Sequence, residues 1–507
     1  MKKYIGAIDQ GTTSTRFIIF DKQGSIISTG QKEHDQICKK PGWVEHDPVQ
    51  IWENTKFVIA QAFETANIES HELAAIGITN QRETVLAWDK TTGKPFLNAI
   101  VWQCTRTQNI CDALIKEGGQ NRFKKQTGLP VATYFSGPKI KWLLDNIPEV
   151  KQAVNNGNAM FGTMDTWIIW NLTGGSKCGL HVTDVTNASR TMLMNLETLE
   201  WDKDILSVFG IAEHTLPKIV PSSDSKAFGK TIQNSLFNIS VPIGGAIGDQ
   251  QAALFGQTCF EKGEAKNTYG TGCFFLLNTG HKPRFSEHGL LTTVGFKIGN
   301  GRPCYALEGS IAYAGALVQW IRDNLGLIKK ASDIETLAKQ VEDNGDVYLV
   351  PAFSGLFAPY WRSDARGVIT GLTQFANKAH IARAVIESTA FQTKDIVNAI
   401  KDDVKDDIDL KHLKVDGGMV ANKLLMQFQA DILNVEVILP KVVETTALGA
   451  AYAAGLAVGF WDNLEDLKKN WAVQFTFSPT KDKAWIENLY SGWKKAVQTT
   501  FNWTTKK

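Results

Sequence analysis

Apolar runs and polar turns alternate along the first thirty residues. Tyr4 to Ile8 is continuously apolar, Arg16 to Phe20 contains a second apolar run, and Ser25 to Thr29 has the length of a short strand. The polar stretches 9–14 and 21–24 separate them. Short apolar runs bounded by turn residues are typical of β-strands. The pattern predicts a three-stranded meander whose central strand is buried.

The same order of strand and turn returns in the second half of the chain. Glu264 to Thr268 leads into a glycine-containing turn, and Cys273 to Leu277 is the next apolar run. Further strands are expected at 290–296 and 304–307. Gly11 in the first turn and Gly270 in this turn lie about half the chain length apart. A repeat of this period favours duplication into two similar α/β domains.

Helical patterns follow each meander. Asp47 and Pro48 suit the N-cap and first position of a helix, and apolar residues recur at near-helical spacing from Ile51 to Phe63. Ile381 to Ser388 indicates a second helix. The charged stretch Lys401 to His412 is expected to be a solvated connection.

Composition and charge limit the classes of partner. Of the 507 residues, 43% are hydrophobic and 21% are charged, and 54 Lys and Arg nearly balance 52 Asp and Glu. No field of one sign favours nucleic acid or an anionic membrane. The length exceeds that of one compact domain, so we predict an N-terminal domain at 1–254 and a C-terminal domain at 255–507.

Cysteine usage and hydropathy indicate a cytoplasmic protein. The seven cysteines are odd in number and lack Cys-x-x-Cys spacing, which fits a reduced compartment. The longest near-apolar run, Ala447 to Trp461, is shorter than the roughly 20 residues that span a bilayer. Gly455 and Gly459 within it have small-xxx-small spacing. We predict a buried helix packed closely on its neighbours, and no stable membrane insertion.

The turn after the first strand has the composition of a phosphate site. Thr12, Thr13 and Ser14 follow Gly11 and add hydroxyls to a row of backbone N–H groups, which suits phosphate oxygens. No Gly-Lys-Ser/Thr is present and a strand follows, so the turn is not a P-loop. The alternative is an ordinary polar hairpin turn.

Two charged side chains flank this turn. Asp9, at the end of a buried strand, can hold Mg²⁺ through water, because Mg²⁺ prefers carboxylate oxygens and keeps several waters. Arg16 adds positive charge nearby. The second-half turn Asn267 to Gly272 has the same composition as the first turn. One such turn in each half can grip the phosphates of a nucleotide from two sides.

Further strand-to-helix turns supply candidate site residues. Asp249 follows the apolar run Val241 to Ile247, near the strand end where α/β folds place ligands; the alternative is a helix N-cap. Asp416 to Gly418 follows another strand and precedes Asn422 at a helix start, which is a candidate base or ribose site or simply a tight turn. Gly315 and Gln319, one helical turn apart, face that pocket or form a close helix-packing point.

Arg82 and Glu83 lie side by side after a predicted strand at 74–78. Such a pair offers donors and acceptors to vicinal hydroxyls, and the alternative is a structural ion pair. Trp102, Tyr134 and Phe274 are candidates for the wall of a pocket, although a lone aromatic residue is more often part of a core.

These residues stand in motifs that resemble a known family. YFSGPKIKWLLDN at 134–146 and GVITGLTQFANKAHIARAVIE at 367–387 resemble the signature patterns of the FGGY family of carbohydrate kinases. The resemblance runs from about Lys3 to about Val497. Five further motifs resemble its glycerol-phosphorylating branch: ITNQRET at 78–84, IVWQCTRT at 100–107, TDVTNASRTML at 183–193, GDQQAALFG at 248–256 and NTYGTGCF at 267–274.

The resemblance implies two actin-like (RNase H-like) domains with an ATP and substrate cleft between them. It implies phosphorylation of glycerol to sn-glycerol 3-phosphate by ATP with Mg²⁺, in a cytoplasmic homo-oligomer, either a dimer or a tetramer. Asp249 matches the catalytic base, and Asp9 and Asp249 are the expected metal residues. The glycerol positions are Thr12, Arg82, Glu83, Trp102, Tyr134, Asp249, Gln250 and Phe274. The nucleotide positions are Thr12, Thr13, Ser14, Arg16, Thr271, Gly315, Gln319, Gly418 and Asn422.

Two regulatory features of the family are not matched. The stretch Thr231 to Ser240 lacks the Gly-Gly-Thr-Arg loop that binds fructose 1,6-bisphosphate in some bacterial relatives, and it lacks the histidine that others present for activating phosphorylation. Two other functions stay open from the residues: a sister kinase acting on a ketopentose or gluconate, and a non-enzymatic actin-like or chaperone-like ATPase without a polyol pocket.

Overall fold

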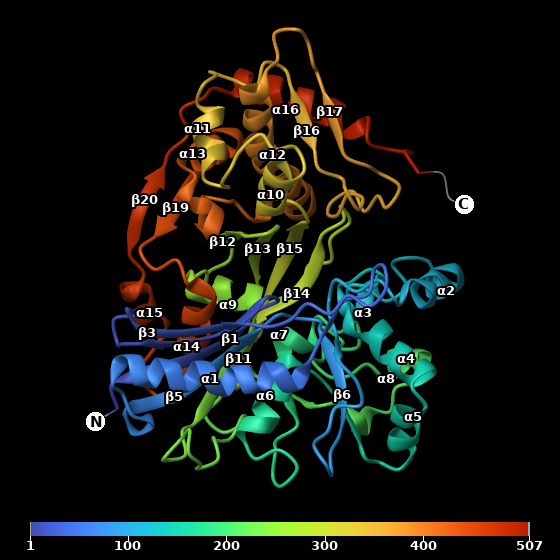
Figure 1. Ribbon diagram of the computed structural model, residues 1–507, viewed down its shortest axis with the longest axis vertical. Helices are drawn as coiled ribbons and strands as arrows, with labels where there is room; N and C mark the ends of the chain where they lie inside the picture. The colour runs from blue at the N-terminus through green and yellow to red at the C-terminus, as the bar shows by residue number, and fades with distance from the viewer. Residues whose placement is uncertain (1, 505–507) are drawn as a thin grey trace.

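The N-terminal apolar runs form the meander of the first main sheet (Figure 1). The computed structural model describes residues 2–504, in which β1 (Tyr4–Gln10), β2 (Ser14–Phe20) and β3 (Ile26–Glu33) are consecutive antiparallel strands. β5 (Leu73–Asn80) lies parallel to β1, and β11 (Ile243–Gly248) lies parallel to β5. The predicted meander with a buried centre is confirmed, since β1 and β2 are buried along most of their length.

The second main sheet repeats this topology. β12 (Ala265–Tyr269), β13 (Cys273–Gly280) and β15 (Cys304–Ile311) are antiparallel in turn. β18 (His412–Asp416) lies parallel to β12, and β19 (Glu436–Pro440) lies parallel to β18. The sheet is completed at its two edges by β14 (Leu291–Phe296) and β20 (Val473–Phe477). Two sheets of one topology confirm the predicted duplication into two α/β domains.

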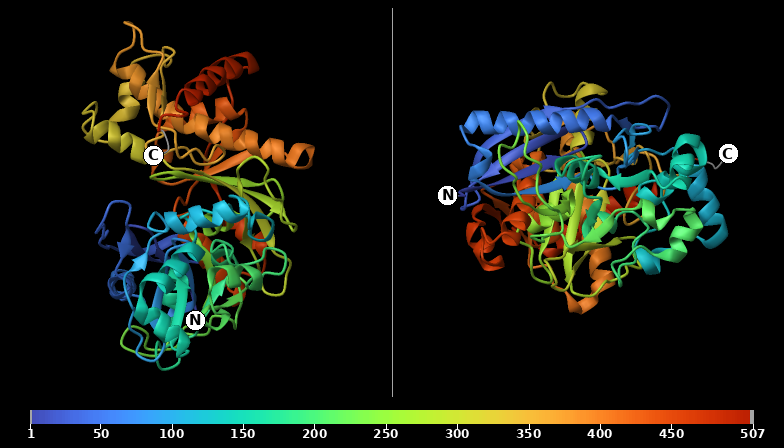
Figure 2. Two further views of the ribbon diagram at one scale, coloured as in Figure 1. Left: turned by 90° about the vertical axis from the view of Figure 1, so that its right-hand side faces the viewer. Right: turned by 90° about the horizontal axis from the view of Figure 1, so that it is seen from below.

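Helices cover both faces of the first sheet. α1 (Pro48–Ala66) begins as predicted, with the Asp47 carboxylate accepting a hydrogen bond from the Val49 amide at 2.8 Å. It lies on one face, where Ile8 and Ile78 belong to the same core cluster as its Val58 and Ile59, while Ala7 and Ala75 on the opposite face belong to one cluster with residues of α14 (Thr445–Ala457) (Figure 2). A helix of the second half therefore completes the core of the first domain.

The buried helix predicted at 447–461 is confirmed as far as Ala457, where α14 ends, but its closest contact is not at the predicted glycines. Gly455 rests against the ring of Trp461, and Gly459 lies beyond the helix with φ of 70°. The close approach is made at Gly449, where a Cβ atom would overlap the backbone carbonyl of Ala252 on α9 (Asp249–Gly256). The absent side chain lets the two helices touch along their backbones.

The charged stretch after 400 is only partly a connection. α12 (Lys378–Val404) contains the predicted helix and continues to Val404, whose side chain is buried. The expectation of a solvated connection at 401–412 is therefore wrong at both ends, because an apolar contact extends α12 to Val404 and His412 is the first residue of β18.

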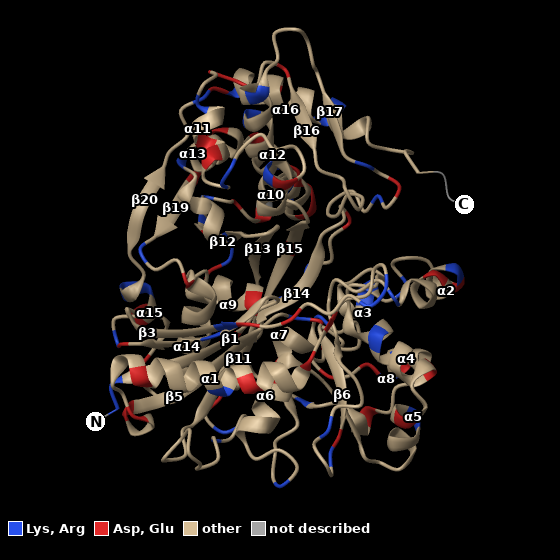
Figure 3. Ribbon diagram, in the orientation of Figure 1, with Lys and Arg blue, Asp and Glu red and all other residues tan. Residues whose placement is uncertain are grey.

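A smaller sheet and several helices form the side of the first domain that carries the aromatic candidates Trp102 and Tyr134. The sheet has the order β4 (Glu45–His46), β7 (Ala99–Ile100), β6 (Val85–Asp89) and β8 (Ala159–Thr163). α4 (Ser136–Asn146) packs on it beside α2 (Gln108–Gly118). Lys and Arg are interspersed with Asp and Glu over both domains (Figure 3). Within residues 2–504, no helix combines the length and apolar character needed to cross a bilayer.

Candidate active site

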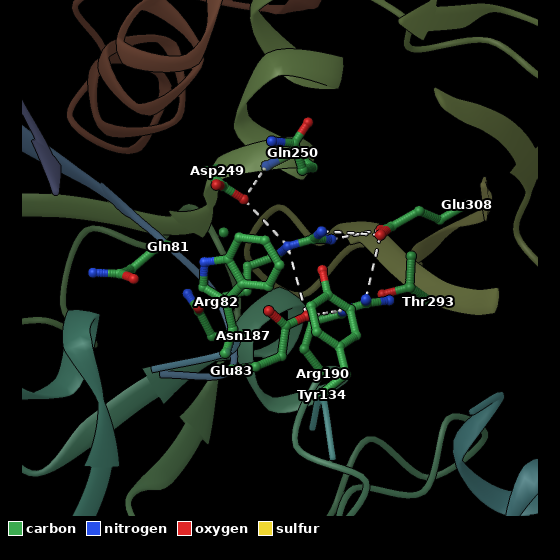
Figure 4. A network of polar contacts seen from close by, with 12 residues as sticks. Gln81, Arg82, Glu83, Tyr134, Asn187, Arg190, Asp249, Gln250, Thr293 and Glu308 are labelled. Atoms are coloured by element: carbon green, nitrogen blue, oxygen red, sulfur yellow. Dashed lines mark hydrogen bonds and ion pairs between the residues drawn. The ribbon is translucent and has the colours of Figure 1, made fainter. Parts of the chain in front are cut away.

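Arg82 and Glu83 lie on the turn between β5 and β6 (Val85–Asp89), and each side chain is only 2% exposed (Figure 4). The two charged groups approach each other only to 3.9 Å. Arg82 instead donates two hydrogen bonds to Glu308 on β15, at 2.5 and 2.9 Å, and Glu83 accepts one from Arg190 Nε at 2.6 Å. The pair is thus part of a larger buried network that joins both domains.

Asp249 is the first residue of α9, directly after the carboxyl end of β11. Gly248 occupies the N-cap, so Asp249 is not the capping residue, although its carboxylate accepts a hydrogen bond from the Gln250 amide at 2.7 Å. The Asp249 side chain is 27% exposed, and its Oδ1 lies 3.2 Å from Arg82 Nε. Burial raises the pKa of Asp249 to about 6, against the opposing effect of Arg82.

A buried lysine that the sequence did not single out contacts the same helix end. Lys266 on β12 donates to Gln250 Oε1 at 2.6 Å and to Thr268 Oγ1 at 2.9 Å. Burial lowers the pKa of Lys266 to about 8, although Asp416 and Asp249 favour its charged form. Gln250 is therefore held by a cation from the second domain.

The three predicted aromatic residues lie around this cluster. The rings of Trp102 and Tyr134 meet edge to face at 5.5 Å, and the Trp102 indole N–H donates to Thr12 Oγ1 at 3.0 Å. Phe274, on β13 of the second domain, lies 5.9 Å from the Arg82 guanidinium. The aromatic residues connect the Arg82 cluster with the first polar turn.

The first polar turn is a tight hairpin held through its carbonyl groups. Gly11 N donates to Ser14 O at 2.9 Å. The carbonyl of Thr12 accepts from Gln36 Nε2 at 2.9 Å, and that of Gly11 accepts from Gln81 Nε2 at 3.2 Å. Among residues 2–504, no acceptor is bonded to the Thr12 and Thr13 amides. This arrangement leaves N–H groups available to an anion, and sequence reasoning identified neither glutamine.

Asp9 and Arg16 form an ion pair beside this turn. Asp9 is 3% exposed, and its Oδ2 lies 2.6 Å from Arg16 Nη2. Arg16 Nη1 lies 2.6 Å from Glu444, immediately before α14. The guanidinium is thus shared between carboxylates of the two halves, and Asp9 raises the pKa of Arg16.

The second polar turn lies against the start of α10 (Gly315–Asp323), which carries Gly315 and Gln319. The Thr271 carbonyl accepts from the amides of Ala314 and Ala316, each at 3.0 Å. Gly315 packs on Gly270, where a Cβ atom would lie 2.6 Å from the carbonyl oxygen. This close packing was the alternative considered for Gly315.

The remaining nucleotide candidates lie on the turn after β18. Gly418 begins a 3-10 turn at Gly418–Ala421, and the neighbouring Met419 Sδ would lie 3.5 Å from a Cβ at Gly315. The Asn422 side chain caps α13 (Lys423–Leu433) by accepting from the Leu425 amide at 2.9 Å. The structure brings these turns together at one end of the second sheet.

A separate cavity of about 490 Å³ lies between the two domains on the side of α3 (Lys124–Thr127). Residues 120–130 of the first domain and 287–290, 359–361 and 395–402 of the second contribute to its lining. None of the predicted site residues lines it. The polar cluster around Arg82, and not this cavity, therefore contains the predicted chemistry.

Comparison with known proteins gives a consistent assignment. The N-terminal and C-terminal domain models of the FGGY family of carbohydrate kinases match residues 4–256 and 265–458. The glycerol kinases of Pseudarthrobacter chlorophenolicus and Chloroflexus aggregans are each 60% identical to the chain over 503 residues, covering 99% of it and 99% and 100% of their own lengths.

Solved structures support the same family assignment. The crystal structure of Plasmodium falciparum glycerol kinase with ADP superposes with a TM-score of 0.90 at 42% identity, covering 98% of each chain. A ligand-bound xylulose kinase from Lactobacillus acidophilus shares the fold at 23% identity, with a TM-score of 0.87 and the same coverage. The predicted two-domain actin-like architecture and the family resemblance are both confirmed. The chain belongs to the FGGY family of carbohydrate kinases.

Proposed function

We propose that the protein transfers the γ-phosphoryl group of ATP to a primary hydroxyl of glycerol and forms sn-glycerol 3-phosphate. The observation that carries the proposal is the contact of Asp249 with Arg82, in a cluster lined by Glu83, Gln250 and the predicted aromatic residues. The full-length similarity to proteins named glycerol kinase supports this substrate.

The polyol is bound by charged and amide groups that are already held in place. Arg82 offers an N–H donor, and Glu83 offers a carboxylate acceptor. Gln250, whose carbonyl oxygen is bonded to Lys266, presents its amide NH₂ to a hydroxyl oxygen. Hydrogen bonds to charged groups contribute about 1.5–3 kcal/mol each. Trp102, Tyr134 and Phe274 contact the carbon chain.

Asp249 acts as the general base. A carboxylate with a pKa of about 6 is mostly ionised at neutral pH, and it is a stronger base than an ordinary aspartate. It accepts the proton of the attacking hydroxyl as the oxygen approaches the γ-phosphorus. Positioning and charge neutralisation supply most of the catalysis in phosphoryl transfer.

The two polar turns bind the nucleotide. The free amides of Thr12 and Thr13, with the hydroxyl of Ser14 and the charge of Arg16, receive phosphate oxygens. The second domain contributes Thr271, Gly315, Gln319, Gly418 and Asn422. Arg16 reaches a phosphate by exchanging one of its two carboxylate partners, and Glu444 is the more exposed of the two.

Asp9 and Asp249 are the residues that would hold Mg²⁺ together with the nucleotide. Their carboxylate oxygens are the donors this ion prefers, and two carboxylates suffice for an ion that keeps several waters and binds phosphate. The ion supplies neutralisation of phosphate charge. Within residues 2–504 no cluster of three His, Cys, Asp or Glu forms a complete protein cage.

The proposal extends to the organisation of the protein: domains at 1–254 and 255–507, a cytoplasmic location, and a homo-oligomer of two or four chains. Light scattering coupled to gel filtration measures the number of chains directly. A monomer at micromolar concentration would contradict the proposed homo-oligomer.

The decisive assay measures ADP formed from ATP and Mg²⁺ with glycerol, erythritol, xylulose or no acceptor. ADP release that depends on glycerol is expected. Faster release with xylulose would identify a sister sugar kinase. Equal release without an acceptor would identify an ATPase.

A further inference from the structure

Two fully buried residues, Arg190 and Glu308, lie behind the polyol-binding pair, and no motif argument assigned them a role. Arg190 follows the short helix α7 (Val185–Ala188) of the first domain, and Glu308 lies on β15 of the second. Both side chains are 0% exposed. Arg190 Nη2 donates to Glu308 Oε1 at 3.2 Å, which closes a ring that also contains Arg82 and Glu83 (Figure 4).

Glu308 determines which part of Arg82 is free. Arg82 Nη1 donates to Glu308 Oε2 and to Gln251 Oε1, Nη2 donates to Glu308 Oε1, and Nε faces Asp249. A guanidinium carries five N–H groups. Among the described residues, four of them thus have partners, and one N–H on Nη2 is left for a ligand.

In the same way, Arg190 determines which carboxylate oxygen of Glu83 is free. Its Nε donates to Glu83 Oε1 at 2.6 Å, while no donor among the described residues is bonded to Oε2. A carboxylate with one oxygen held in this way presents the other to a hydroxyl donor. The ring therefore leaves one free donor on Arg82 and one free acceptor on Glu83, on neighbouring residues of one turn, and vicinal hydroxyls require a donor and an acceptor of this kind.

Glu308 keeps its negative charge at any physiological pH. Burial alone would raise the pKa of Glu308, but Arg190 and Arg82 more than offset burial and lower it to about 2. Two guanidinium groups and two carboxylates balance one another. A buried ion pair of this kind contributes little net stability, so positioning is a better account of its presence than stability.

Glu308 reaches the first domain because the edge hairpin β14–β15 extends across the domain boundary. Ser189, next to Arg190, is bonded to Thr293 on β14 at 2.8 Å, and the Tyr305 hydroxyl on β15 donates to the Leu196 carbonyl at 2.6 Å. The hairpin thus carries a nucleotide-domain carboxylate into the polyol site.

We propose that Arg190 and Glu308 are positioning residues. Arg190 fixes which oxygen of Glu83 is free to bind a hydroxyl, and Glu308 fixes which N–H of Arg82 is free. Because Glu308 belongs to the second domain, the arrangement of Arg82 depends on the position of that domain. The inference rests on the proposed function, since it concerns how that polyol site is held. It makes polyol binding sensitive to two residues that do not contact the polyol.

The test uses Glu308→Gln and Arg190→Lys in the full chain, with Tyr305→Phe as the matched control. Tyr305→Phe removes a hydrogen bond between the domains from the same strand but leaves the ring intact. We expect Glu308→Gln and Arg190→Lys to raise the glycerol KM at least tenfold while the ATP KM changes less than twofold. The control is expected to keep both constants within twofold.

The two KM values separate positioning from a structural role. A purely structural role lowers thermal stability without changing the glycerol KM, whereas a positioning role changes the glycerol KM and leaves the ATP KM within twofold. If Glu308→Gln does not fold, the glycerol and ATP KM values of Arg190→Lys alone test the inference. Lowered thermal stability with an unchanged glycerol KM overturns the inference. Wild-type protein without glycerol-dependent activity overturns the proposed function, and the inference with it.

Discussion

Asp249 Oδ1 and Arg82 Nε lie 3.2 Å apart, so the proposed base and the proposed polyol ligand form one ion pair. The pair has opposing effects on the aspartate. Burial disfavours its charge, whereas the guanidinium stabilises it, and the balance is a pKa of about 6. A base with this pKa is ionised at neutral pH and still accepts a proton more readily than an exposed aspartate.

Replacing Asp249 by Asn should lower kcat by about 10²–10⁴-fold, which is the usual contribution of a positioned general base. The wild-type kcat/KM should fall as the pH drops through about 6, because protonation removes the base. Steady-state kinetics from pH 5 to 9 measures both effects. Thermal unfolding of the variant serves as the control for an intact fold. Near-normal kcat in a folded variant would remove Asp249 from this role.

Lys266 should set the alkaline limb of the same profile. Its pKa is about 8, so the ammonium beside Gln250 loses its charge as the pH rises through that value, and kcat/KM for glycerol should decline there. Lys266→Met should be less active at pH 7 and should lack this limb. Lys414→Met is the matched control, because Lys414 is also buried but donates to the Gln257 carbonyl at 2.9 Å. If the alkaline decline of kcat/KM persists in Lys266→Met, the titration of another group causes it.

Local patterns were enough to predict the elements but not the network between them. The meanders and the α1 cap depend on residues within a few positions of one another, and their predictions were confirmed. Glu308 directly follows the strand predicted at 304–307, and its partner Arg82 is more than 200 positions away. A carboxylate directly after an apolar run was the available signal, because a buried charge requires a cationic partner.

Contacts between the two halves of the chain account for the other differences between the sequence prediction and the structure. Glu444 reaches Arg16, and Gly449 contacts α9, because α14 returns to the first sheet. No local pattern specifies which domain a buried helix joins. The sequence therefore predicted a closely packed helix at the right place but assigned the contact to Gly455 and Gly459 instead of Gly449.

Trp102→Phe should weaken ATP binding more than glycerol binding. The indole N–H holds the Thr12 hydroxyl at 3.0 Å, whereas phenylalanine retains an aromatic face toward the polyol. Loss of one such hydrogen bond costs about 0.5–1.5 kcal/mol, so the ATP KM should rise about 2- to 13-fold. Trp201→Phe is the control, since it removes an indole hydrogen bond to the Pro217 carbonyl. Equal ATP KM values in the two variants would contradict a role in holding the turn.

Gly449→Ala should lower both stability and kcat. The added methyl group overlaps the Ala252 carbonyl, so α9 must move, and overpacking of this kind costs about 1–3 kcal/mol. Asp249 is the first residue of α9, and a shift of that helix displaces the proposed base from Arg82. Urea unfolding and kcat measure the two consequences.

Ala457→Gly distinguishes this mechanism from general weakening of the helix. Ala457 is the last residue of the same helix, eight positions beyond Gly449, and glycine there should cost at most about 0.5–1 kcal/mol through helix propensity, because that figure applies to a helix interior. The expected result is reduced stability in both variants but reduced kcat only in Gly449→Ala. If kcat falls equally in both, global stability and not the α9 contact controls activity. If kcat is unchanged in Gly449→Ala while its stability falls, the position of Asp249 does not depend on the Gly449 contact.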